Sequence, residues 1–216
     1  MKKWIIGGIL VVGIVGIGIM QLRNSEKEPD QSLPITGIQA TTTTSEPSSP
    51  PAPISIPKPA PFTGIALLPG DAIASWDFKG AYTGNPELES KADAELARLQ
   101  SLMGSQQYPD YVLYVSMANQ YDLKGDGRQE LAYLEKALAI DSTRTGLAWY
   151  NAGQLLKRLG AYRTARVAFE RAATVQPVAQ YQKALTDFLK THFPSDTSAI
   201  KASEQVQDQS NRAGIQ

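Results

Sequence analysis

Cysteine is absent from this chain of 216 residues, and histidine occurs once, as His192. Without thiols the chain has no means to form a disulfide, a thiolate metal site or a thiol nucleophile, and one histidine cannot build a His-rich metal cage. We expect His192 to have a surface or helix-terminus role. The charges balance at 21 basic and 21 acidic residues, without a block of like charge. This balance excludes the basic footprint that is typical of nucleic-acid binding.

Other signals for chemistry are also missing. The stretch 122–127 has some features of a calcium loop, but Lys124 stands where a second oxygen ligand belongs and Tyr133 where the bidentate glutamate should be. No glycine-rich phosphate loop follows a strand pattern. The sequence therefore predicts that the chain is not an enzyme and that it has no cofactor, no metal site and no small-molecule substrate.

An uncharged apolar run near the N-terminus is the first feature that is present. Trp4–Leu22, as a helix, would be roughly 28 Å long, which matches the hydrocarbon core of a bilayer. A cleaved signal peptide is the alternative, but only Gly16 and Gly18, inside the apolar run, could serve as the small residues before the cut. We therefore predict a transmembrane helix over residues 4–22 and a single-pass membrane protein.

The charges that flank this run do not decide its orientation, since Lys2 and Lys3 precede it and Arg23 and Lys27 follow it. The N-terminal tail, residues 1–3, is too short to cross as a domain, and a long polar segment follows of the kind that translocates behind a first helix. We predict a cytoplasmic N-terminus and an extracytoplasmic location for the rest of the chain.

Residues 23–70 are rich in proline, serine and threonine, with seven prolines between positions 47 and 61. Such a segment packs no core and favours polyproline II, which extends about 3.1 Å per residue, so we predict a disordered linker that acts as a stalk. A proline-rich docking motif is the alternative, and the hydroxyl residues leave glycosylation open. At the other end, the polar residues 194–216 predict a disordered tail.

The part expected to fold lies between these segments, over residues 71–193. Trp76, Phe78 and Tyr82 alternate between glycines, which indicates a strand-like segment or a packed loop that covers an apolar surface. Asn85 followed by Pro86 is a typical helix start. Apolar residues at helical spacing continue from there, so we predict a helix over 86–104.

The following segment repeats itself at a constant offset of 35 residues. The paired positions are Tyr114 with Trp149, Ala118 with Gly153, Tyr121 with Leu156, Gly125 with Gly160, Leu134 with Phe169 and Ala137 with Ala172. A period in this range, with a glycine turn between two helices, is typical of stacked helical hairpins. We place the two repeats at about 111–144 and 146–179.

The second copy carries its pattern on Trp149, Gly153, Gly160, Tyr162, Ala165, Phe169, Ala172 and Pro177. It resembles the tetratricopeptide repeat (TPR) family, whose pattern is a large aromatic, a small pair, an aromatic, Ala-x-x-x-Phe and a closing proline. It departs from that pattern at Ala152 and Leu156. The first copy departs at Gly127, Glu130 and Ser142, which replace the turn aromatic, the small residue and the proline.

The resemblance implies an all-α fold, a short TPR-like solenoid of helical hairpins. In this chain the transmembrane helix and the disordered linker predicted above would precede it. Two repeats alone would be marginal, because each hairpin needs a neighbour to cover its apolar face. The helix at 86–104 and a last helix at 177–192 would cap the pair, which gives six helices. Gly153 would let two helices approach closely, with Trp149 and Phe169 beside it.

The resemblance also implies a protein-interaction scaffold, which binds a protein or peptide partner at the membrane surface in a groove along the first helix of each repeat. The residues expected there are Asn119, Asp122, Tyr150, Asn151, Gln154, Lys157 and Arg158. On the same side, Val115 replaces the lysine of relatives that clamp a terminal carboxylate. We therefore expect an extended segment held by side-chain amides, with Lys157 or Arg158 favouring acidic residues.

Other interpretations of these residues stay open. They are solvated helix positions if no partner binds them, since amide and charged side chains are ordinarily exposed. The array could instead be a structural envelope component that packs against itself, or an accessory subunit of a membrane enzyme complex. A groove with side chains of mixed polarity would favour peptide binding, whereas an apolar outer face and concentration-dependent assembly would favour self-packing.

Overall fold

The computed structural model describes residues 62–212, which contain seven helices and no strand. The helices are α1 (Pro86–Ser101), α2 (Asp110–Lys124), α3 (Gly127–Ile140), α4 (Leu147–Arg158), α5 (Tyr162–Val175), α6 (Ala179–His192) and α7 (Thr197–Arg212). The prediction of an all-α fold is thereby confirmed for this part of the chain. Within it, no helix is both long and apolar enough to cross a bilayer. The predicted span at 4–22 lies outside the described residues.

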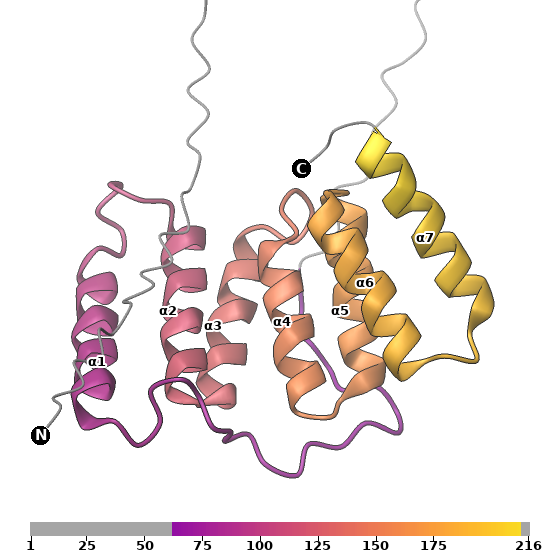
Figure 1. Cartoon of the computed structure of the whole chain (residues 1–216). Coiled ribbons are helices and arrows are strands. Elements are labelled where there is room, and N and C mark those ends of the chain that lie inside the picture. Colours follow the sequence, from indigo (N-terminus) through magenta and orange to yellow (C-terminus); the bar gives the residue numbers. More distant parts are fainter. Residues whose placement is uncertain (1–61, 213–216) are drawn as a thin grey trace, which may run out of the picture. The chain divides into compact units, whose positions relative to one another are not determined.

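The helices pack in chain order as antiparallel neighbours (Figure 1). The most extensive contacts are those of α2 with α3, α4 with α5 and α6 with α7, so each of these pairs forms a hairpin. Each hairpin then packs against the next through α3 with α4 and α5 with α6, and α1 covers α2. This is repeat-like helical packing, in which each element depends mainly on its neighbours in sequence.

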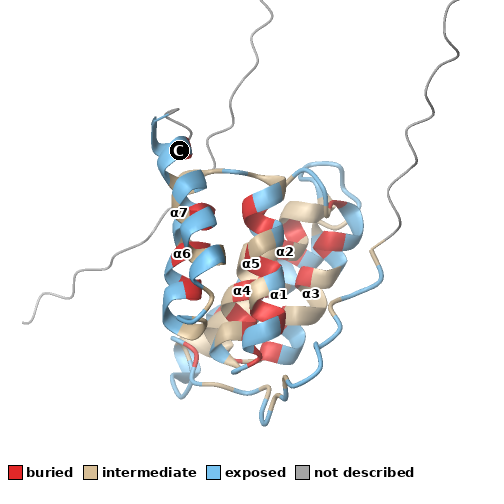
Figure 2. Ribbon diagram, turned by 90° about the vertical axis from the view of Figure 1, so that its right-hand side faces the viewer, coloured by how far each residue is buried: buried red, intermediate tan, exposed pale blue. Residues whose placement is uncertain are grey.

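One apolar core runs between the hairpins. Figure 2 shows that the buried residues lie on the sides of the helices that face one another. The large side chains with almost no exposure include Leu134, Leu138, Leu155, Leu156, Phe169 and Leu189. A second, smaller cluster of Leu99, Leu113 and Met117 joins α1 to α2.

The disorder predicted for residues 194–216 is wrong for 197–212, which form α7. Asp196 caps this helix, because its carboxylate accepts a hydrogen bond from the backbone N–H of Ala199 at 3.1 Å. Arg166 of α5 pairs with Asp196 at 2.8 Å, and Lys190 of α6 pairs with Glu204 at 2.8 Å. Capping and ion pairs therefore fix a helix whose apolar content is low, which explains why the sequence pattern missed it.

The boundary predicted at residue 70 is also wrong, because the chain packs on the helices from Phe62 onward. We call residues 62–84 the N-terminal arm. The ring of Phe62 meets that of Trp149 edge to face at 5.6 Å between centroids. The backbone N–H of Ile65 donates to the Glu135 carboxylate at 2.7 Å. In Figure 1 the arm then passes along the lower ends of the helices to α1.

The arm closes against the turn between α2 and α3. Phe78 N–H donates to the Gly125 carbonyl at 3.0 Å, Gly127 N–H donates to the Trp76 carbonyl at 2.9 Å, and the two segments form one isolated antiparallel bridge. Gly125 has φ +83°, and a Cβ atom there would lie 2.0 Å from the Phe78 carbonyl oxygen. A Cβ on Gly127 would lie 2.6 Å from the Trp76 carbonyl oxygen. The aromatic segment is thus a packed loop, and its close approach explains why glycine replaces the turn aromatic in the first repeat.

The arm also caps α5 from a distance in sequence. No side chain at Ala161, the residue before α5, caps the helix. Instead the Asp71 carboxylate accepts hydrogen bonds from the backbone N–H groups of Arg163 at 3.1 Å and Thr164 at 2.6 Å, and from the Thr164 hydroxyl at 2.7 Å. Burial alone would raise the pKa of Asp71, but these hydrogen bonds outweigh it and hold the pKa below its usual range.

We expect Asp71→Ala to lower the free energy of unfolding of a 62–212 fragment by about 1–2 kcal/mol, the usual cost of losing a helix cap. Urea titration at pH 7 measures it. Asp77→Ala is the control, because Asp77 is an exposed carboxylate of the same arm whose side chain makes no hydrogen bond to the described residues. Equal losses in the two variants would show that the carboxylate of Asp71 does not cap α5.

A second prediction concerns the contact between α4 and α5. A Cβ atom on Gly153 would lie 2.9 Å from the Phe169 ring. Gly153→Leu should therefore overfill the hairpin and cost about 1–3 kcal/mol in a urea titration. Ala94→Leu, at an exposed position of α1, should leave stability nearly unchanged. A Gly153→Leu variant as stable as the wild type would contradict this packing.

Candidate functional site

Two adjoining hollows lie along α2, α4 and α6. The first, which we call the amide pocket, has a volume of about 210 Å³ and is lined by Asn119, Asp122, Glu130, Asn151, Gln154 and Arg158. The second, which we call the aromatic pocket, has a volume of about 590 Å³ and lies between α4 and α6 over α5. Gln154 lines both, so the two pockets adjoin, and we refer to them together as the groove.

Helical periodicity places the α4 side chains in this groove. Tyr150, Gln154 and Lys157 recur at spacings of four and three residues, which puts them on one face of the helix. The opposite face holds Ala148, Ala152 and Leu155, all buried. Because the apolar face of α4 is packed in the core, its polar face is turned toward the groove.

The amide pocket is held together by side-chain pairs across α2 and α4. Asn151 Nδ2 donates to Asn119 Oδ1 at 3.2 Å. The Arg158 guanidinium pairs with the Asp122 carboxylate and stacks over the Phe78 ring of the arm at 4.3 Å. Five of the seven residues predicted from the sequence therefore meet here.

Glu130 of α3 is the pocket residue that we did not predict. Its side chain is 5% exposed, and its Oε2 atom has no hydrogen-bond partner among the described residues. Burial raises its pKa to about 8, with repulsion from Asp122 adding to the shift and attraction by Arg158 opposing it. At neutral pH this carboxyl is mostly protonated. One feature of the sequence could have pointed to this residue: at the 35-residue offset, Glu130 aligns with a small residue, Ala165, in the second repeat.

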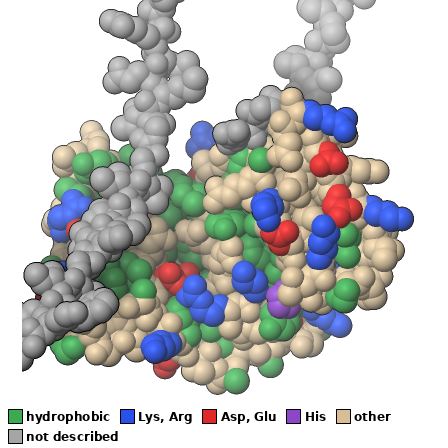
Figure 3. Space-filling view, in the orientation of Figure 1, with side chains coloured by type: hydrophobic (Ala, Val, Ile, Leu, Met, Phe, Trp, Pro, Cys, Tyr) green, Lys and Arg blue, Asp and Glu red, His purple; other side chains and the backbone are tan. Residues whose placement is uncertain are grey.

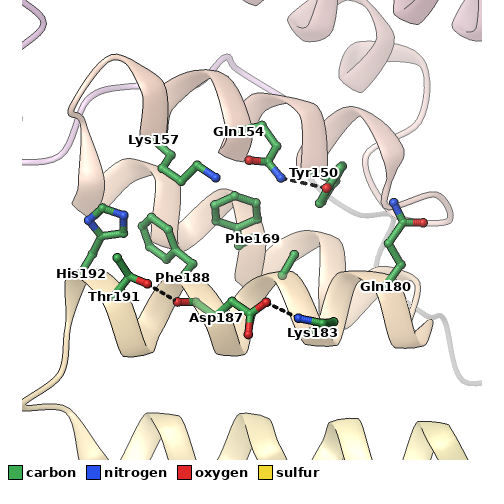
Figure 4. Close-up of a pocket in the computed structure, with 11 residues that line it drawn as sticks. Tyr150, Gln154, Lys157, Phe169, Gln180, Lys183, Asp187, Phe188, Thr191 and His192 are labelled. Atoms are coloured by element: carbon green, nitrogen blue, oxygen red, sulfur yellow. Dashed lines mark hydrogen bonds and ion pairs between the residues drawn. The ribbon is translucent and has the colours of Figure 1, made fainter. Parts of the chain in front are cut away.

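The aromatic pocket combines an apolar floor with polar walls. Figure 4 shows the rings of Phe169 and Phe188 between α4 and α6, with Lys157 and His192 at one end. Tyr150 hydroxyl accepts a hydrogen bond from Gln154 Nε2 at 2.8 Å, which holds that amide over the floor. The α6 residues that line this pocket, among them Gln180, Lys183, Asp187 and His192, were not among the predicted site residues.

The predicted basic residues have different surroundings in the structure. Arg158 is neutralised by Asp122, so its guanidinium has a partner already. Lys157 forms no ion pair with the described residues. Burial lowers the pKa of His192, and the nearby charge of Lys157 adds to this shift. The His192 ring stacks on Tyr162 at 4.2 Å between centroids. In Figure 3 the histidine lies beside basic and apolar side chains on this face. Lys157 is therefore the groove cation left to meet an acidic group.

Val115 does not line the groove, contrary to our expectation. It is 4% exposed and belongs to the main core cluster with Ala118 and Leu134. It lies one helical turn before the groove residue Asn119, at a point of α2 that the core covers. A valine there is a packing residue.

No protein-family model, no curated protein and no solved structure matches this chain. Within residues 62–212, no group of three or more metal-binding side chains comes together. The chemistry of the site therefore follows from its own geometry. Amide groups, an uncharged buried carboxyl and an apolar floor are suited to holding a ligand by hydrogen bonds and contact area.

Glu130 gives a pH-dependent prediction. Its folded-state pKa of about 8 exceeds its ordinary value of 4.5, so the folded protein holds a proton that the unfolded chain releases. Stability should therefore fall as pH rises from about 5 to 8, by at most about 1.4 kcal/mol per pH unit from this group.

Glu130→Gln removes the titratable carboxyl group and keeps the size and shape of the side chain. We expect its free energy of unfolding, from urea titrations at pH 5, 6, 7 and 8, to change less with pH than that of the wild type. Glu87→Gln, which removes an exposed carboxylate of α1, should keep the wild-type slope above pH 6. Identical slopes for wild type and Glu130→Gln would contradict the raised pKa.

Proposed function

We propose that this chain is a membrane-anchored scaffold of the TPR type, whose groove binds an extended segment of a protein partner. The observation that carries the proposal is the groove itself, where amide side chains from two repeats meet beside a pocket with an aromatic floor. The 35-residue offset, the glycine contact within the α4–α5 hairpin and the order of the hairpins support the TPR assignment. The proposal assigns the chain no catalysis and no cofactor.

An extended segment fits the groove better than a folded surface does. A peptide in extended conformation presents unpaired backbone N–H and C=O groups, and side-chain amides can both donate to and accept from them. Asn119, Asn151 and Gln154 supply such groups. Asn151 donates to Asn119 and Gln154 donates to the Tyr150 hydroxyl, which holds these amides in place before a ligand arrives. Preorganisation of this kind reduces the entropy lost on binding.

Contact area would come from the aromatic pocket. Tyr150 lies against Phe169 at 6.0 Å and Tyr181 at 5.2 Å between ring centroids, so its ring is fixed while one edge faces the groove. Rigid aromatic side chains of this type commonly supply much of the affinity of an interface. Apolar side chains of the bound segment would pack on this floor.

The location follows from the sequence-based expectations for the N-terminal segments. With the span at 4–22 and a proline-rich linker, the groove would stand away from an extracytoplasmic membrane face and recruit its partner there. The alternatives are a self-packing structural component of the envelope and an accessory subunit of a membrane enzyme complex.

Peptide selection tests the proposal. Random peptides displayed on phage are selected on the full chain in detergent, and the affinity of the selected peptides is then measured for wild type, Tyr150→Ala and Asn151→Ala. We expect each variant to lose about 1–2 kcal/mol of binding free energy, because a few residues dominate such interfaces. Arg171→Ala, at an exposed position of α5, should bind like the wild type.

The proposal fails if the selected peptides bind all these variants equally while their melting temperatures are unchanged. Selection of no peptide, together with mass that grows with concentration in light scattering, would favour the self-packing alternative.

A further inference from the structure

The amide pocket contains more acid than its base can neutralise. Asp122 of α2 and Glu130 of α3 both line it, whereas Arg158 of α4 is its one basic residue. Arg158 pairs with Asp122, so its charge is already compensated. When Glu130 is ionised, the pocket carries one negative charge that no described side chain balances.

Glu130 also stands in the pocket without a structural partner. With 5% exposure it is more than nine-tenths buried, and its Oε2 is screened from solvent and makes no hydrogen bond to the described residues. Leaving a buried carboxyl unpaired costs stability. The equivalent position of the second repeat is Ala165, which is fully buried and costs nothing of this kind. Packing therefore gives no reason for a glutamate at position 130.

The space in front of Glu130 has room for a ligand group. The pocket volume of about 210 Å³ exceeds that needed by a single water several-fold. Five of the six lining residues carry a side-chain oxygen that can accept a hydrogen bond: Asp122, Glu130, Asn119, Asn151 and Gln154. The sixth, Arg158, is already paired with Asp122. A group that brings several N–H donors and one positive charge would satisfy these acceptors.

We propose that the amide pocket binds the cationic head of a lysine or arginine side chain of the partner segment, with Glu130 as its counter-ion. The inference rests on the proposed function and refines it, because it names the residue type that the groove selects and where that residue sits. The aromatic pocket is unsuited to the same cation, since it presents Lys157, Lys183 and His192 with one carboxylate, Asp187, already paired with Lys183.

Binding should release a proton. The charged groups that face Glu130 are Asp122 and Arg158, and with these alone it is mostly protonated at pH 7. An incoming ammonium or guanidinium favours the ionised form, so the carboxyl O–H bond breaks, its proton passes to the buffer, and the carboxylate pairs with the cation. A neutral ligand that merely accepts a hydrogen bond from protonated Glu130 releases none.

The test uses the full chain in detergent and two small probes, N-acetylarginine amide and its neutral isostere N-acetylcitrulline amide. Isothermal titration calorimetry at pH 7, in buffers of different ionisation enthalpy, reports affinity and protons released. We expect the arginine probe to bind at least tenfold more tightly than the citrulline probe and to release about one proton per ligand. Nα-acetyllysine amide, which keeps its ε-ammonium group, should behave like the arginine probe.

Glu130→Gln should weaken the arginine probe at least tenfold and abolish the proton release, while Glu87→Gln should bind like wild type. Proton release is measured on the wild-type chain alone, so it tests the inference even if Glu130→Gln does not fold. Equal affinity for the arginine and citrulline probes, or arginine binding without proton release, would overturn the inference.

The same experiments separate this inference from the function on which it rests. If selected peptides lose affinity in Tyr150→Ala but contain no preferred basic residue and ignore Glu130→Gln, the groove binds peptides and the cation pocket is refuted. If the arginine probe binds with proton release while no peptide is selected, the pocket is supported and the peptide-binding function is refuted.

Discussion

The contact between the Phe169 ring and the bare backbone of Gly153 determines how closely α4 and α5 pack, and the site depends on it as much as the fold does. The same ring forms the floor of the aromatic pocket and supports Tyr150. A wider α4–α5 spacing would separate the groove side chains of α4 from the floor beneath them. This one packing contact therefore supports both the stability of the fold and the shape of the groove. In a repeat protein the contacts between neighbouring helices are the core, so they also hold the binding surface in place.

Two of the positions at which the first repeat departs from the TPR pattern, Gly127 and Glu130, do so for different physical reasons. Gly127 is required because the backbone of the N-terminal arm passes too close for any side chain. Glu130 has no comparable packing reason and lowers stability above its ordinary pKa. Natural proteins retain destabilising residues where these carry function, so the two departures deserve opposite interpretations: one is structural and the other points to a ligand.

The sequence predicted the helices well because their signals are local. Glycine turns, a cap at Asn85 and the constant offset all act within a few residues of the element that they define. Residues 62–70 of the arm and helix α7 were missed because distant partners hold them in place: Glu135 binds Ile65, Thr164 binds Leu68, and Lys190 pairs with Glu204. In the groove, helical spacing was enough to predict that the α4 residues share one face. The burial of Glu130 depends on the packing of three helices, which a local sequence pattern does not predict.

The arm also explains why Glu130 lacks a partner among the described residues. Arg158 is the basic residue of the same pocket, yet it is held from two sides, by the Asp122 carboxylate and by the Phe78 ring. Phe78 is fixed in turn by its backbone hydrogen bond to Gly125. To reach Glu130, the guanidinium would have to give up both contacts and leave Asp122 unpaired instead, which merely moves the unbalanced charge. A cation that completes the pocket must therefore come from outside residues 62–212.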